Sequence, residues 1–157
     1  MTDAITGPDL YEDDFYAWCM GQAAALRRRE RGVNGLDYDN LAEELRGLAK
    51  TDFRACQSFV TLIIQHLVLL AMQPGSQDAP HWRLEVATFR GDIEDYLTDS
   101  LAPKIRRRLP RLRAKAVREL QRKRYPLDFA EARRVADSLS WEQIMDEDWW
   151  PERPTPE

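Results

Sequence analysis

The chain is poor in the residues that metal centres, disulfide frameworks and phosphate-binding loops require. It has two cysteines, two histidines and seven glycines among 157 residues. Cys19 and Cys56 both lie among helix-forming residues, so we expect two reduced thiols rather than a disulfide framework. No Gly-rich phosphate loop, His-Glu-x-x-His motif or Glu-x-x-His pair occurs. The sequence therefore predicts no cofactor.

Long hydrophobic runs are also missing. The strongest covers residues 59–72 and is interrupted by Gln65 and His66, whereas a membrane span needs about 20 mostly apolar residues. The first ten residues contain acids and Pro8, where a signal peptide would have basic and then apolar residues. We therefore expect a cytoplasmic protein that does not span a membrane.

Charge is plentiful but unevenly distributed. The chain is 43% hydrophobic and 32% charged, which is typical of helices with long solvated faces. The formal net charge is −4, yet residues 103–136 hold 13 basic and 3 acidic side chains. One strongly basic segment therefore sits in an otherwise acidic chain.

The spacing of apolar residues predicts a single all-α domain over residues 1–157, a helical bundle of four main helices with a short helical C-terminal appendage. Pro110 predicts a kink or restart in the fourth helix, and the length of the second allows a bend near Gly47 or Thr51-Asp52. Short helices are expected after Asp128 and Ser140, and flexible tails at residues 1–8 and 152–157. The main helices are expected from about Leu10 to Arg31, from Asp37 or Asp39 to Met72, after Asp78-Ala79-Pro80 as far as Leu97, and from Ser100 to Tyr125-Pro126.

Two stripes of side chains at helical spacing mark the expected packing faces of the first two helices. The stripe in the first helix consists of Tyr11, Phe15, Trp18, Gln22 and Leu26. The stripe in the second consists of Leu41, Leu45, Leu48, Asp52, Ala55, Phe59, Leu62, His66 and Leu70.

Two blocks of sequence carry a family resemblance. They are Tyr11-x-x-Asp14-Phe15-Tyr16-x-Trp18 and Leu36-Asp37-x-x-Asn40-Leu41-Ala42-Glu43-Glu44, with weaker matches that include Asp99-Ser100 and Glu142-Gln143-Ile144. Together they resemble a bacterial family known as domain of unknown function number 29, over about Tyr11 to Pro151. The resemblance implies a small helical bacterial protein, and it implies no activity, substrate or catalytic residue.

The basic segment offers the first candidate site. Six cations of the predicted helix over 103–124 form one stripe, which could neutralise the phosphates of a nucleic acid. The favoured interpretation is plainer: the stripe lies near acidic surfaces from Glu12, Asp13, Glu43 and Glu44, or is solvated. No aromatic residue for base stacking interrupts the stripe, which consists of Lys104, Arg108, Arg111, Lys115, Arg118 and Arg122.

A metal site is the second candidate. Asp14, Glu43, Glu44 and His66 could converge if the first two helices pack antiparallel, and carboxylates with a histidine can bind metal. The plainer roles are electrostatic partners of helix starts for the acids, and a buried His66 hydrogen-bonded to a polar neighbour such as Tyr16 or the Trp18 indole.

The third candidate is the tryptophan pair Trp149-Trp150, which could anchor a partner or fasten the C-terminal segment to the bundle itself. Self-docking is favoured, because the expected helix at Ser140 delivers the pair beside the bundle. The sequence as a whole favours a non-catalytic interaction or regulatory module, with a protein partner or self-association. A nucleic-acid-associated protein and a metal-dependent enzyme are the alternatives.

Overall fold

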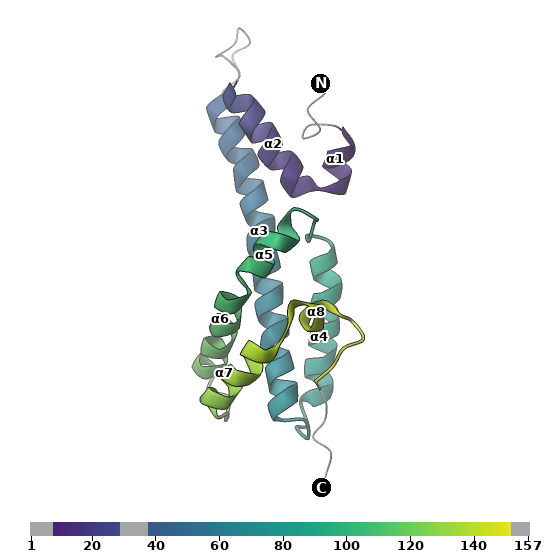
Figure 1. The fold of residues 1–157 in the computed structure, drawn as a ribbon, viewed down its shortest axis with the longest axis vertical. Helices are drawn as coiled ribbons and strands as arrows, with labels where there is room; N and C mark the ends of the chain where they lie inside the picture. Colours follow the sequence, from purple (N-terminus) through teal and green to yellow (C-terminus); the bar gives the residue numbers. More distant parts are fainter. Residues whose placement is uncertain (1–7, 29–37, 152–157) are drawn as a thin grey trace.

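The computed structural model describes residues 8–28 and 38–151, and all of their regular structure is α-helical. The prediction of an all-α fold is therefore confirmed for this part of the chain. Figure 1 shows how the helices are arranged. In order they are α1 (Pro8–Asp13), α2 (Phe15–Arg28), α3 (Tyr38–Met72), α4 (Ala79–Glu94), α5 (Leu101–Arg107), α6 (Leu109–Arg122), α7 (Phe129–Ser138) and α8 (Trp141–Met145).

Helix α3 organises the molecule. It runs unbroken for 35 residues. The bend considered near Gly47 or Thr51-Asp52 therefore does not interrupt the helix. One half lies beside α2, against which α1 packs, and the other half is surrounded by α4, α5, α6 and α7 (Figure 1). We call α1, α2 and the half of α3 beside them the arm, and the remainder the body.

The hydrophobic core lies in the body. It is built on the second half of α3, where nearly every apolar side chain from Cys56 to Leu70 is buried. Trp82, Val86 and Ile93 of α4 pack into the same cluster, together with inward residues of α5 to α8. A helix that is apolar on almost every side is typical of a core position, because neighbours cover each face.

The face of α3 that packs in the arm differs from the predicted stripe. Leu41 and Leu48 are 41% and 50% exposed, whereas Ala42 and Ala49, one position along, are fully buried. Small side chains let the axes of two helices approach closely, and α2 contributes buried Cys19 and Ala23 to this contact region. The interface in the arm therefore uses small residues, and the leucines lie beside it.

The first predicted helix is also divided. The structure ends α1 at Asp13 and begins α2 at Phe15, because Asp14 caps the second helix as described below. Pro8 belongs to α1 rather than to a tail. Other predicted features, namely the arginines after Arg28 and the tails at 1–7 and 152–157, lie outside the described residues.

The breaks predicted in the basic segment and the appendage are confirmed. The fourth predicted helix separates into α5 and α6 at Arg108, and Pro110 occupies the first turn of α6, where its missing N–H costs no hydrogen bond. Ser140 and Gln143 form the expected capping box at the start of α8.

By length and hydropathy alone, α3 could cross a membrane: its most apolar window has a mean hydropathy of 1.8. More than half of that window, 56%, is covered by the rest of the protein. Such cover is expected of the core helix of a soluble helical protein.

A candidate nucleic-acid interface

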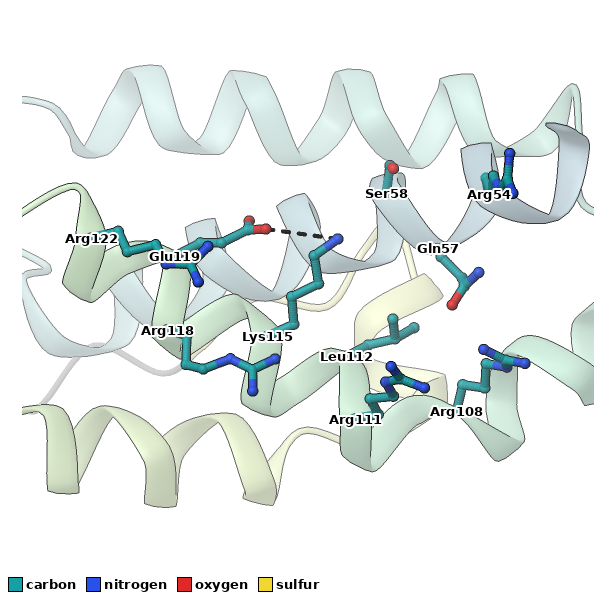
Figure 2. Close-up of a pocket in the computed structure, with 10 residues that line it drawn as sticks. All are labelled: Arg54, Gln57, Ser58, Arg108, Arg111, Leu112, Lys115, Arg118, Glu119 and Arg122. Carbon is teal, nitrogen blue, oxygen red and sulfur yellow. Dashed lines mark ion pairs between the residues drawn. The ribbon is translucent and has the colours of Figure 1, made fainter.

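A groove between α3 and α6 gathers five of the six cations of the basic stripe. Its volume is about 530 Å³. In Figure 2 the α6 side chains line one wall, and Arg54, Gln57 and Ser58 project from α3 opposite them. We call this the basic groove, and it is lined by Arg54, Gln57, Ser58, Arg108, Arg111, Leu112, Lys115, Arg118, Glu119 and Arg122.

A second hollow of about 450 Å³ continues from it toward the arm and shares Arg108. Here Lys104 lies 4.8 Å from the ring centroid of Tyr16 and donates to its hydroxyl at 3.3 Å. Arg108 lies 4.9 Å from the centroid of Phe53. All six residues of the predicted basic stripe therefore line one of two adjoining hollows, and aromatic rings stand at the arm end.

The basic groove is electrostatically unbalanced. Among its lining residues, six cationic side chains face one carboxylate, that of Glu119. Glu119 is already engaged, since it accepts from the Gln65 amide and lies 3.7 Å from Lys115. Among described residues, no ion pair involves Arg54, Arg111, Arg118 or Arg122.

The favoured explanation of the basic stripe had two forms. The described residues record no ion pair between the stripe and Glu12, Asp13, Glu43 or Glu44, whereas a solvated stripe fits the exposure of its side chains. Glu43 instead pairs with Arg27 at 3.2 Å and Lys50 at 3.8 Å, both within the arm. Glu12 and Asp13 are exposed on α1. In the segment 103–124, the ion pairs that the structure records are Lys115–Glu119 and Arg106–Glu142. Most of the basic stripe is thus left facing solvent.

The metal-site candidates are not brought together. Glu43 and His66 are 23 residues apart on an unbroken helix, which separates them by about 35 Å. In the described residues no group of three His, Cys, Asp or Glu side chains could hold a metal ion. The geometry gives the metal-dependent enzyme no support.

His66 has a partner that the sequence did not indicate. Its Nδ1 lies 2.7 Å from the Leu62 carbonyl, one turn earlier on α3, and its ring packs 5.8 Å from that of Phe89. Burial lowers the pKa of His66, and its hydrogen bond to Leu62 acts in the opposite direction. A neutral imidazole donating to a carbonyl is a structural role, and neither Tyr16 nor Trp18 takes part.

Comparison with protein families identifies the chain. The family model described as domain of unknown function DUF29 matches residues 10–150. The chain belongs to this family. A solved relative in fold is the crystal structure of an α-helical protein of unknown function from Rhodospirillum rubrum ATCC 11170, with a TM-score of 0.68 and 25% identity. That match covers 88% of this chain and 90% of the other.

No curated protein matches the chain. The comparisons therefore show the family and the fold of this DUF29 protein.

Asp14 joins the arm to the body. Its carboxylate accepts from the backbone N–H of Ala17 at 2.9 Å, which caps α2. The same carboxylate accepts from the backbone N–H and the hydroxyl of Ser100, each at 2.8 Å, at the start of α5. A residue considered for metal binding is thus 7% exposed and holds two helix starts together.

Replacing Asp14 by alanine should destabilise the DUF29 protein by about 2 kcal/mol, because one cap and two charge-assisted hydrogen bonds are lost. Burial raises the pKa of Asp14, but hydrogen bonds from Ala17, Ser100 and Thr98 lower it below its ordinary 3.8. A lowered pKa contributes stability that is complete above the unfolded-state value and is lost as pH falls through the folded-state value. Urea denaturation should show a large difference between variant and wild type at neutral pH and a smaller one in acid. Asp13→Ala, one residue away and exposed, is the control and should change little; an equal loss in both variants would contradict this role.

The tryptophan pair is fastened to the body. Trp149 and Trp150 pack against the core cluster, and the Trp150 ring lies 5.0 Å from the Arg83 guanidinium and 5.1 Å from that of Arg90. This is the self-docked arrangement that the sequence favoured over a partner anchor.

Arg90 is the residue that sequence reasoning missed. It is 2% exposed, and its guanidinium donates to the carbonyls of Gln143, Ile144 and Trp149 at 2.9, 2.9 and 3.1 Å. Burial lowers the pKa of Arg90, while the nearby charges of Asp146 and Glu147 raise it. One side chain of α4 thus satisfies three backbone acceptors of the C-terminal segment, including carbonyls near the end of α8 that lack partners within that helix.

Proposed function

We propose that the protein is a non-catalytic binding module whose basic groove holds the phosphate backbone of a single-stranded nucleic acid. The observation that carries the proposal is the groove itself, in which six cationic side chains converge on a space with one engaged carboxylate. Guanidinium and ammonium groups in such numbers bind phosphates mainly by releasing condensed counterions, without reading the base sequence.

The dimensions of the groove fit an extended strand. From Arg108 to Arg122 it follows about 21 Å of helix, at 1.5 Å per residue. Phosphates of one strand in a duplex rise about 3.4 Å apart, and an unpaired strand can extend further, so several phosphates can lie along this wall. A basic groove that tracks one backbone is a usual arrangement in proteins that bind single strands.

Tyr16 and Phe53 supply what the basic stripe lacks on its own. They stand beside Lys104 and Arg108 at the arm end of the second hollow. Aromatic rings next to cations can stack bases, which adds affinity without sequence preference. These rings come from α2 and α3, so the pairing with the basic helix exists only in the folded protein.

A non-catalytic role is supported by what lines the groove. Its residues are cations, two polar groups, one leucine and a carboxylate in an ion pair. Cations outnumber every other kind of side chain in this lining, which suits charge neutralisation of a bound phosphate backbone. The cytoplasm is the compartment we propose, since single-stranded nucleic acid occurs there and the free thiols of Cys19 and Cys56 would stay reduced.

Salt dependence tests the proposal. We expect a fluorescent single-stranded oligonucleotide of mixed sequence to bind with an affinity that falls steeply with salt. Contact by six cations predicts a slope of log affinity against log salt of about −4. Changing the base sequence should alter the affinity little, and a duplex of the same sequence should bind more weakly. A flat salt response, or no binding at low salt, would overturn the proposal.

A further inference from the structure

The arm carries an apolar face that the rest of the described chain leaves uncovered. Four of the six large hydrophobic residues that are exposed in the described residues lie on the arm, and three of these four lie on this face: Tyr11, Leu41 and Leu48. The largest exposures are 48% for Tyr11 and 50% for Leu48. A hairpin of two helices has no third layer to cover its sides, so such a face is expected to find cover elsewhere.

Helical geometry places the two sequence stripes on one side of the arm. Leu41 and Leu48 directly precede the buried Ala42 and Ala49 of α3, and Trp18 and Gln22 directly precede the buried Cys19 and Ala23 of α2. Each preceding residue is rotated by about 100° from the interface position. Because α2 and α3 run antiparallel (Figure 1), the preceding residues of both helices project to the same side.

Aromatic packing extends this face. Trp18 lies 4.9 Å from Tyr11 and 6.0 Å from Phe15, centroid to centroid. Leu45 continues the leucine line, with spacings of four and three residues that match the seam of a coiled coil. We call this surface the seam face, and it consists of Tyr11, Phe15, Trp18, Gln22, Leu26, Leu41, Leu45 and Leu48.

The seam face has the apolar spacing of a hydrophobic core, yet its side chains are only partly covered. Tyr11, Leu41 and Leu48 are 48%, 41% and 50% exposed. Two helices that each present such a seam are half of a four-helix bundle. A second copy of the same hairpin supplies the other half with the same spacing and the same mixture of aromatic and leucine side chains. A two-fold axis relating the two copies would place the seam face of one against the seam face of the other.

Charge along the arm also suits a second copy. Exposed Arg28 ends α2 near the arm tip, and exposed Glu12 and Asp13 lie on α1 at the other end of α2. When two arms lie antiparallel, the basic C-terminal end of each α2 meets the acidic α1 residues at the N-terminal end of the other α2, and the complementarity occurs twice. We infer that the protein forms a two-fold dimer through the seam faces of its arms, arranged antiparallel.

The test is oligomeric state in solution, measured by sedimentation over about a hundredfold range of concentration. We expect the wild type to be a dimer, and Leu48→Glu to raise the dimer dissociation constant about a hundredfold or more, because each substitution acts at both halves of the interface. Leu84→Glu is the matched control: Leu84 is 64% exposed on α4, outside the arm, and that variant should dimerise as the wild type does. Helical circular dichroism should be unchanged in both.

A charge exchange tests the antiparallel orientation. Arg28→Glu and Glu12→Arg should each weaken the dimer, and the two substitutions together should restore it. A wild type that stays monomeric throughout, or a Leu48→Glu variant that dimerises normally, would overturn the dimer. A double variant that is weaker than either single variant would overturn the orientation. These outcomes are independent of nucleic-acid binding, since the seam face and the basic groove share no lining residue.

Discussion

Replacing Arg90 by methionine is expected to cost the protein about 3 to 5 kcal/mol of unfolding free energy, because three backbone acceptors lose their donor at once. Methionine fills much of the same space but donates no hydrogen bond. The carbonyls of Gln143, Ile144 and Trp149 would then lose the donor that satisfies them, and an unsatisfied buried acceptor costs about 1–3 kcal/mol. Urea denaturation followed by tryptophan fluorescence and helical circular dichroism measures the loss.

Arg83 provides a matched control for this prediction. Its guanidinium also lies over the Trp150 ring, at 5.0 Å, but the structure records no bond from it to a carbonyl of this segment. Arg83→Met should therefore cost only the cation–π interaction, about 0.5–1 kcal/mol. Arg90→Lys should fall between the two, because one ammonium cannot span three carbonyls as a planar guanidinium does. Equal losses in Arg90→Met and Arg83→Met would show that the carbonyl bonds contribute little.

The sequence predicted those features of the fold that local chemistry determines. Pro110 marked the break between α5 and α6, and Ser140 with Gln143 marked the start of α8. Both are signals contained within one turn of helix. The break at Asp14 had a local component too, since the carboxylate caps Ala17, but the bond that anchors it comes from Ser100, 86 residues away. A helix predicted from hydrophobic spacing alone therefore continues across such a position.

The buried line of α3 in the arm could not be predicted from hydrophobicity. Leucines at heptad spacing are the stronger pattern, and Ala42 and Ala49 look neutral beside them. The close approach of α2 favours the line with the alanines as the buried one, because small side chains admit a second helix where leucines would hold it away. In the inferred dimer, the leucine pattern still marks a hydrophobic core, which the two chains share.

Part of the candidate site could likewise be predicted from the sequence, and part of it could not. The basic stripe was visible in the sequence, because its residues recur on one face of a helix. The sequence did not show that Arg54, Tyr16 and Phe53 lie beside this stripe. Their positions depend on which helices pack beside α5 and α6. Arg90 gave no signal at all, because its partners are backbone carbonyls 53 to 59 residues away.

The basic stripe also acts against the stability of its own helix. Arg111 with Lys115, and Arg118 with Arg122, are like charges four residues apart, and each such pair destabilises a helix by about 0.2–0.5 kcal/mol. Within the described residues, one carboxylate on this face offsets them. Under the proposed function, a bound anionic strand would offset this cost.

Removing three charges from the basic groove is therefore expected to have the largest effect on binding. The variant Arg111→Gln/Arg118→Gln/Arg122→Gln should lower the affinity for a single-stranded oligonucleotide by about two orders of magnitude at ~0.1 M salt, and should reduce the salt slope by about 2. All three residues are exposed, so the fold should be unaffected or slightly stabilised by the lost repulsion. Fluorescence anisotropy at several salt concentrations measures both quantities.

The control variant has to change net charge equally without touching the groove. Arg106→Gln/Arg133→Gln/Arg134→Gln does so, because these exposed arginines lie outside the lining and each is paired, with Glu142, Asp137 and Glu131 respectively. If the groove binds the backbone, the control should keep most of the wild-type affinity and slope, since surface ion pairs contribute little to the fold. If both triple variants weaken binding to the same extent, the affinity follows net charge alone and the groove is not the site.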